Sequence, residues 1–106
     1  MMDIKTAHEV ACGEARMEAR VLEEIHGDGY PCGFAWVQSY VKGNTKEGKA
    51  LKALGFKKSY TGGYQLWNPS GTMVQNMNIK EAACQKYVDI FEKLTGIKLY
   101  VSSRMD

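Results

Sequence analysis

Residues 32–70 read CGFAWVQSYVKGNTKEGKALKALGFKKSYTGGYQLWNPS, and this stretch contains the signals that decide the fold. Its first part, residues 33–41, is rich in aromatic and β-branched side chains, which is typical of a β-strand. Alternate side chains of a strand point to opposite faces, and both faces of this run are apolar. We therefore expect a central strand that is covered on both sides, with Trp36 buried.

The rest of this stretch predicts a short helix followed by a β-hairpin. Asn44 stands three residues before Glu47, a capping-box spacing that predicts a helix over residues 45–54. The Gly-Gly pair at 62–63 favours a two-residue hairpin turn. Residues 64–67 would then form the return strand.

The chain before this stretch predicts one long amphipathic helix over residues 5–26. Its larger apolar side chains recur at helical spacing and form a stripe. We expect this stripe to face the core, and it consists of Val10, Ala11, Met17, Val21, Leu22 and Ile25. A Gly-Asp-Gly turn at 27–29 and Pro31 would end the helix.

The chain after this stretch predicts a strand, a helix and a strand. Residues 73–77 alternate in the manner of a short strand. Asn78 and Glu81 repeat the capping-box spacing, which predicts a helix over residues 79–94. Residues 97–101 read as a closing strand, and we expect the polar residues after them to form a tail.

The predicted order is therefore α-β-α-β-β-β-α-β. Three helices and four or five strands predict an α+β fold, as a two-layer sandwich with a mixed, mainly antiparallel sheet. A chain of 106 residues is long enough for a single domain with its own core.

Composition favours a cytoplasmic protein without a membrane segment. No apolar run approaches the ~20 residues that a membrane-spanning helix needs. The first residues, MMDIKTAHEV, lack the basic and apolar regions of a signal peptide. The three cysteines are odd in number and widely spaced, which argues against a disulfide framework and for a reducing compartment.

Charge is distributed unevenly along the chain. Residues 1–30 hold seven acids and three bases, whereas residues 31–58 hold six lysines and one glutamate. Lysines can neutralise phosphates while neighbouring aromatic rings stack on unpaired bases. This pattern predicts a nucleic-acid contact made by Lys42, Lys46, Lys49, Lys52, Lys57, Lys58, Tyr60 and Tyr64. The alternative is that the lysines form a solvated surface and the tyrosines belong to the core.

A second candidate is a polar site for a small enzyme, made by Cys32, Asn68, Ser70 and Arg104. Cys32 could serve as a nucleophile if a turn placed His26 beside it as a base. The histidines and cysteines lack metal-site spacing, so we expect neither a metal nor a cofactor. Phosphate loops, nucleophile elbows and helix-turn-helix patterns are absent from the sequence.

Four motifs carry a resemblance to a known family: CGFAWV (32–37), LWNPSG (66–71), QNMNIKEA (75–82) and the terminal SRMD (103–106). In this linear order they resemble an uncharacterised family of small proteins that tailed bacteriophages encode. The likeness covers residues 26–106 and departs from the family pattern at Asn76 and Val101. It implies a phage origin and a location in the host cytoplasm, and it implies no activity.

Two classes of function follow from these observations. The first is a small phage-encoded accessory protein that binds without catalysis, to nucleic acid through the basic segment or to a host protein. The second is a small enzyme that uses the polar site. The sequence leaves homo-oligomerisation open.

Overall fold

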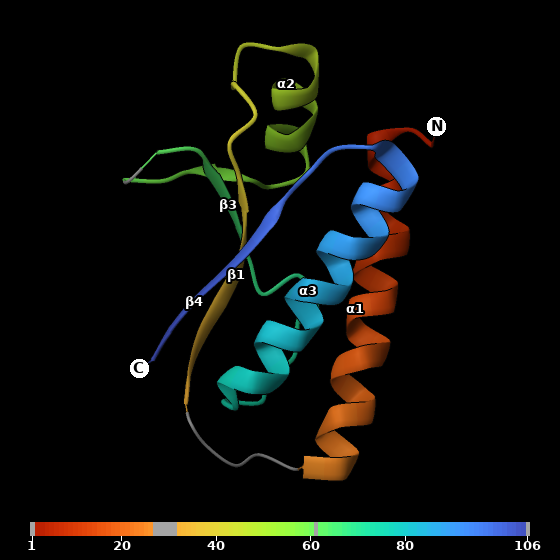
Figure 1. The fold of residues 1–106 in the computed structure, drawn as a ribbon, viewed down its shortest axis with the longest axis vertical. Helices are drawn as coiled ribbons and strands as arrows, with labels where there is room; N and C mark the ends of the chain where they lie inside the picture. The colour runs from red at the N-terminus through yellow and green to blue at the C-terminus, as the bar shows by residue number, and fades with distance from the viewer. Residues whose placement is uncertain (1, 27–31, 61, 106) are drawn as a thin grey trace.

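The computed structural model describes residues 2–26, 32–60 and 62–105, and its helices and strands follow the order α1-β1-α2-β2-β3-α3-β4 (Figure 1). The elements are α1 (Ile4–His26), β1 (Gly33–Ser39), α2 (Lys46–Ala53), β2 (Lys57–Lys58), β3 (Tyr64–Trp67), α3 (Met77–Thr95) and β4 (Tyr100–Met105). The predicted α+β fold is confirmed. The predicted turn at 27–29 and Pro31 lie outside the described residues.

The four strands form an antiparallel sheet in the order β2-β3-β1-β4. β1 is central, as predicted, since β3 pairs with one edge and β4 with the other. β4 begins and ends later in the chain than the predicted strand at 97–101. Its residues Val101 and Arg104 pair with Val37 and Phe34 of β1. The expected polar tail is therefore a strand: the free edge of β1 offers backbone hydrogen bonds to any side-chain sequence.

The predicted strand at 73–77 is wrong, because α3 begins at Met77. Within these residues the sheet contact is a single bridge between Cys32 and Asn76. The Asn76 side-chain oxygen accepts hydrogen bonds from the backbone N–H groups of Asn78 and Ile79, at 2.9 and 3.3 Å. Asn76, and not the predicted Asn78, is therefore the N-cap of α3.

The start of α2 is also shifted by one residue from the prediction. Thr45, and not Asn44, is the N-cap, and its hydroxyl accepts a hydrogen bond from the Gly48 N–H at 3.0 Å. The same hydroxyl donates to the Lys42 carbonyl at 2.6 Å. This second bond ties the cap to the turn that precedes it.

The hairpin between β2 and β3 has a longer connection than the predicted two-residue turn, over residues 59–63. The Ser59 N–H donates to the Gly63 carbonyl at 3.0 Å and closes this connection. Gly63 has a φ of 69°, and a Cβ there would lie 2.3 Å from the Ser39 carbonyl oxygen. Both the backbone conformation and the close approach require glycine.

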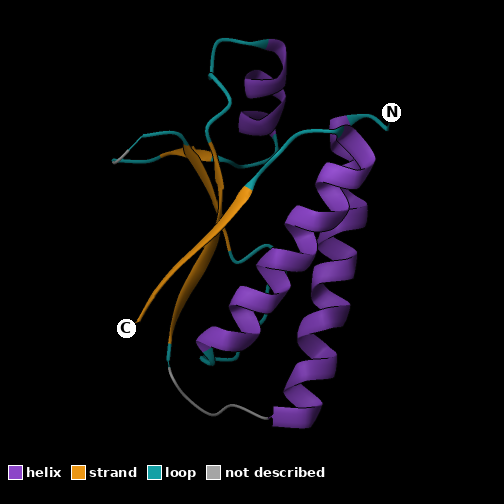
Figure 2. Cartoon of the chain, viewed as in Figure 1, coloured by secondary structure: helices purple, strands orange, loops and turns teal. Residues whose placement is uncertain are grey.

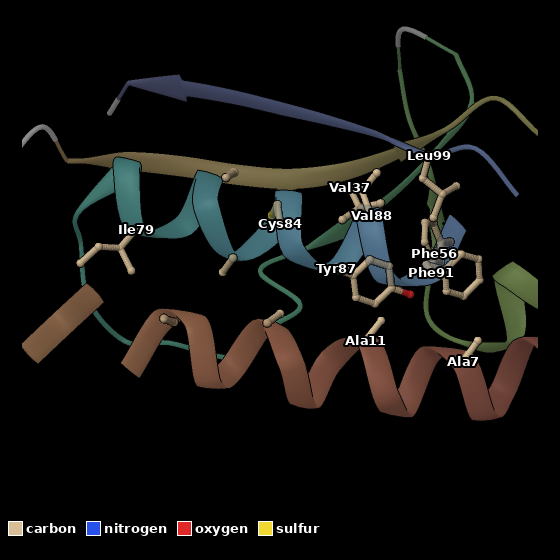
Figure 3. Close-up of a cluster of buried hydrophobic side chains, with 14 of the residues drawn as sticks. Ala7, Ala11, Val37, Phe56, Ile79, Cys84, Tyr87, Val88, Phe91 and Leu99 are labelled. Carbon is tan, nitrogen blue, oxygen red and sulfur yellow. The ribbon is translucent and has the colours of Figure 1, made fainter. Parts of the chain in front are cut away.

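The helices α1 and α3 lie on the same side of the sheet, where they form two successive layers (Figures 1 and 2). α3 contacts β1 and β4, and α1 packs along the far side of α3. Figure 3 shows the resulting core, where Tyr87 and Phe91 of α3 lie between the sheet and the α1 helix. Val37 and Leu99 reach this core from the sheet side.

The buried face of α1 differs from the predicted one. The buried residues are the alanines at every fourth position: Ala7, Ala11, Ala15 and Ala19. Of the predicted stripe, Ala11 is buried and Leu22 is half-buried, whereas Val10, Met17, Val21 and Ile25 are exposed, Met17 at 62% and Ile25 at 67%. The small side chains of α1 leave room for the aromatic residues of α3, which fill the space between the two helices.

The prediction that β1 is covered on both faces is also wrong. α3 packs on the face that carries Ala35 and Val37, which are buried. The described chain places no helix on the opposite face (Figure 2). Trp36 lies on that opposite face and is half-buried, so it is not the buried core residue that the sequence predicts.

Candidate functional site

The uncovered face of the sheet presents side chains from all four strands. Cross-strand partners in an antiparallel pair point to the same face, so the strand registers define which residues share it. We name it the open sheet face, and the registers assign to it Phe34, Trp36, Gln38, Lys57, Gln65, Trp67, Tyr100, Ser102 and Arg104. Tyr40, which follows β1, belongs to the same face because its ring contacts that of Tyr100.

Aromatic rings dominate this face and contact one another. Trp36 and Trp67 stack with ring centroids 4.6 Å apart and an interplanar angle of 20°. Phe34 meets Trp67 edge to face at 6.0 Å, and Tyr40 lies 5.7 Å from Tyr100. Trp67 remains 46% exposed and Tyr40 67% exposed, so their rings are accessible from solvent.

Two glutamine side chains hold the indole rings in place. The Gln38 side-chain oxygen accepts hydrogen bonds from Trp36 Nε1 at 3.3 Å and from Gln65 Nε2 at 3.2 Å. The Gln65 oxygen in turn accepts from Trp67 Nε1 at 2.9 Å. Gln38 Nε2 donates to the Gly62 carbonyl of the hairpin connection at 3.1 Å. The rings are therefore oriented before any ligand arrives.

Cations lie close to two of the aromatic rings, Phe34 and Tyr100. Lys80 Nζ and Arg104 Cζ lie 5.5 and 5.7 Å from the Phe34 ring centroid, and Lys98 Nζ lies 5.9 Å from that of Tyr100. These are cation–π distances. The residues that form the four strands include no aspartate or glutamate. Of these cations, Arg104 belongs to the open sheet face, Lys80 is buried on α3, and Lys98 forms an ion pair with Glu92 at 3.5 Å.

The basic segment predicted from the sequence is divided between two surfaces. Lys57 lies on the open sheet face, whereas Lys46, Lys49 and Lys52 are exposed on α2. Lys52 Nζ lies 5.8 Å from the ring of Tyr64, which is half-buried against the core. The remaining members, Lys42, Lys58 and Tyr60, are exposed. The nucleic-acid role of this segment stays a prediction.

The predicted polar site does not form one hydrogen-bonded cluster among the described residues. Ser70 Oγ donates to the Asn68 side-chain oxygen at 3.2 Å, and Asn68 Nδ2 donates to the Thr72 carbonyl at 2.9 Å. These bonds shape a turn. Arg104 lies on β4, and β1 separates this strand from β3, after which Asn68 and Ser70 follow. Cys32 is exposed at the start of β1.

A cluster that the sequence prediction missed joins α1 to α3. His8 Nδ1 lies 2.7 Å from the Tyr87 hydroxyl oxygen, and Cys12 Sγ lies 3.6 Å from His8 Nε2. The 79-residue separation of His8 and Tyr87 leaves no local sequence signal. Burial lowers the pKa of His8, although the nearby Glu9 carboxylate opposes this shift.

The same burial makes this cluster a poor nucleophilic site. Desolvation raises the pKa of the Cys12 thiol and, more strongly, that of the Tyr87 hydroxyl. Burial first, and then the Glu81 carboxylate, raise the pKa of the Cys84 thiol to about 12. A reactive cysteine needs a lowered pKa that populates the thiolate. These thiols therefore stay protonated at neutral pH, and the cluster joins α1 to α3.

Metal ligands and membrane-spanning helices can be assessed over the part of the chain that the structure describes. No group of three or more histidine, cysteine, aspartate or glutamate side chains there is arranged to hold a metal ion. Among those residues, no helix has both the length and the apolar character that crossing a bilayer requires.

Comparisons with protein-family models, with curated protein sequences and with solved structures find no match. The open sheet face is therefore interpreted from its own chemistry. The sequence contained one signal of this site: Gln38 alternates with Trp36 and Tyr40 on a single strand face. A polar residue within an aromatic face indicates that solvent reaches it.

Proposed function

We propose that this protein binds single-stranded nucleic acid without catalysis and that the open sheet face is the contact surface. The observation that carries the proposal is the stacked pair of Trp36 and Trp67, held by amide hydrogen bonds on an uncovered sheet. Sheets that expose aromatic rings bind unpaired bases by stacking in several families of RNA-binding modules.

Each part of the face has a distinct role in this proposal. The accessible rings of Trp67, Tyr40 and Tyr100 stack on bases, which all have a flat π-surface, so binding tolerates many sequences. Lys57 and Arg104 contact phosphates and release bound counterions. The strand from Phe34 to Tyr40 spans about 20 Å, at the usual rise per residue, which gives room for several nucleotides.

A single strand suits this surface better than a duplex. Bases in a duplex are already stacked on one another, and their flat faces are hidden from protein side chains. The exposed rings of the open sheet face offer stacking and few base-edge hydrogen bonds, because Gln38 and Gln65 are engaged with the indoles. We therefore propose little preference for sequence and a strong preference for unpaired strands.

The basic segment predicted from the sequence, which includes Tyr60, offers an alternative contact surface, and one binding experiment separates the two. Fluorescence anisotropy would follow a labelled twelve-residue oligothymidylate at low salt. Trp67→Ala should weaken binding by about 1–3 kcal/mol if that ring stacks on a base. Tyr60→Ala is the matched control, because Tyr60 is fully exposed and is not part of the open sheet face.

The outcomes distinguish three interpretations. A loss with Trp67→Ala and not with Tyr60→Ala supports the open sheet face. The reverse result favours the basic segment that the sequence predicts. Absence of any complex at high micromolar protein would exclude both nucleic-acid proposals. A host-protein partner would then become the leading alternative for a protein of the proposed phage origin.

A further inference from the structure

A small cavity lies where the open sheet face meets the loop before α3. Its volume is about 220 Å³. Phe34 and Trp67 contribute rings to its lining, and Asn68, Thr72 and Lys80 contribute polar groups. The cavity therefore joins two stacking residues of the open sheet face to the first turns of α3.

Lys80 is a buried cation without a carboxylate partner among the described residues. It is 8% exposed, its Nζ donates to the Gly33 carbonyl at 3.0 Å, and the Phe34 ring centroid lies 5.5 Å away. An ammonium group has three donors, and burial of a charge is costly unless an opposite charge compensates it. A carbonyl and a ring compensate only part of this cost.

The surroundings of Lys80 favour an anion as the missing partner. Arg104 lies near the same ring, 5.7 Å from its centroid, so two cations approach one end of the open sheet face. Glu23 contacts the cavity lining through Thr72, whose hydroxyl donates to its carboxylate at 2.8 Å. Glu23 itself does not line the cavity.

We infer that this cavity binds the terminal phosphate of a single strand that lies on the open sheet face. The inference rests on the proposed function and adds a preference for phosphorylated ends. A terminal phosphate monoester carries more negative charge than an internal phosphate. The loop and α3 bound the cavity, so it suits the end of a strand, while Phe34 and Trp67 hold the terminal base or sugar.

The test compares three versions of one oligothymidylate: unphosphorylated, 5′-phosphorylated and 3′-phosphorylated. Wild-type protein should bind one phosphorylated form at least about fivefold more tightly than the unphosphorylated form, since charge-assisted hydrogen bonds are stronger than neutral ones. Lys80→Met should abolish this difference between the phosphorylated and unphosphorylated strands. Lys93→Met is the control, because Lys93 is exposed on α3 and lies outside both the cavity and the open sheet face.

If Lys80→Met fails to fold, the affinities of wild-type protein for the three strands still test the terminal-phosphate site. Equal affinity for the three strands would overturn the terminal-phosphate site and leave the proposed strand binding intact. A preference that Lys80→Met retains in a folded protein would also overturn it. Absence of binding to every strand would overturn the proposed function, and the inference with it.

Discussion

Trp36 and Trp67 are direct cross-strand partners, and their indole rings stack 4.6 Å apart on a sheet face that no helix of the described chain covers. Stacked rings in such pairs contribute about 0.5–1.5 kcal/mol beyond the area that they bury. This pair therefore stabilises the β1–β3 contact and also keeps a ring available to solvent.

The first prediction concerns the tryptophans and the core. Trp36→Ala should lower the free energy of unfolding by about 1–3 kcal/mol, because it removes a stacked and half-buried ring. Phe91→Ala should cost more, about 3–5 kcal/mol, because Phe91 is fully buried between the sheet and α1. Urea unfolding of both variants measures the difference. Equal losses would contradict the assignment of Trp36 to an uncovered face.

The second prediction concerns the two faces of α1. Ala11→Leu should destabilise the protein by about 1–3 kcal/mol, since added methylene groups overpack the contact with α3. Val21→Gln should change stability by no more than about 0.5 kcal/mol, because its side chain faces solvent. Thermal unfolding followed by circular dichroism compares them. A large loss of stability with Val21→Gln alone would show that the apolar stripe predicted from the sequence, and not the alanine face, is buried.

The third prediction concerns His8 and pH. Burial lowers the pKa of His8 below its ordinary value of 6.5, so the unfolded chain binds a proton at a higher pH than the folded chain does. This contribution to stability is complete above that ordinary pKa and is lost as the pH falls below it. The urea midpoint should therefore decrease on acidification, and less so in His8→Gln. Identical pH profiles for the two proteins would exclude this role of His8.

The fourth prediction concerns the start of α3. Asn76→Ala should lower the free energy of unfolding by about 1 kcal/mol, because two backbone N–H groups lose their acceptor. Asn78→Ala should have little effect, because Asn78 is exposed and lies inside the helix. Chemical denaturation measures both changes. A larger effect at Asn78 would favour the capping box that the sequence predicts.

The fifth prediction concerns salt. If Lys57 and Arg104 contact phosphates, replacement of both with Gln should reduce the slope of log affinity against log salt by roughly 0.7 for each cation. The matched control replaces Lys46 and Lys49 of α2, which are exposed and lie outside the open sheet face. A titration of oligothymidylate binding over a series of salt concentrations gives the slopes. A reduced slope only in the Lys46 and Lys49 variant would indicate that α2 makes the phosphate contacts.

Much of the fold could be predicted from local patterns. The aromatic run at 33–41 indicated the central strand, the helical spacing of apolar residues indicated α1, and the spacing of Asn78 and Glu81 indicated α3. Gly96 ends α3 in the left-handed conformation that its position predicts, with a φ of 78°. The N-caps were displaced by one or two residues, because several neighbouring Asn and Thr side chains could each serve as the acceptor.

The candidate site was only partly predictable. Alternation placed Phe34, Trp36 and Tyr40 on one face, and the structure agrees through the registers of Phe34 and Trp36 and the contact of Tyr40 with Tyr100. Whether a helix covers that face depends on where α1 packs, and its alanines direct it onto α3 instead. The sequence pattern also gave no reason to place Arg104 beside Phe34, since 70 residues separate them.

The sequence by itself determined the element types and the alternation of faces, because these depend on backbone preferences and on side-chain period within a few residues. Only the tertiary structure decided which faces are buried. The order β2-β3-β1-β4 and the stacking of α1 on α3 arise from contacts between distant segments. Burial is a property of the whole assembly, so the uncovered aromatic face emerged only when all the elements were in place.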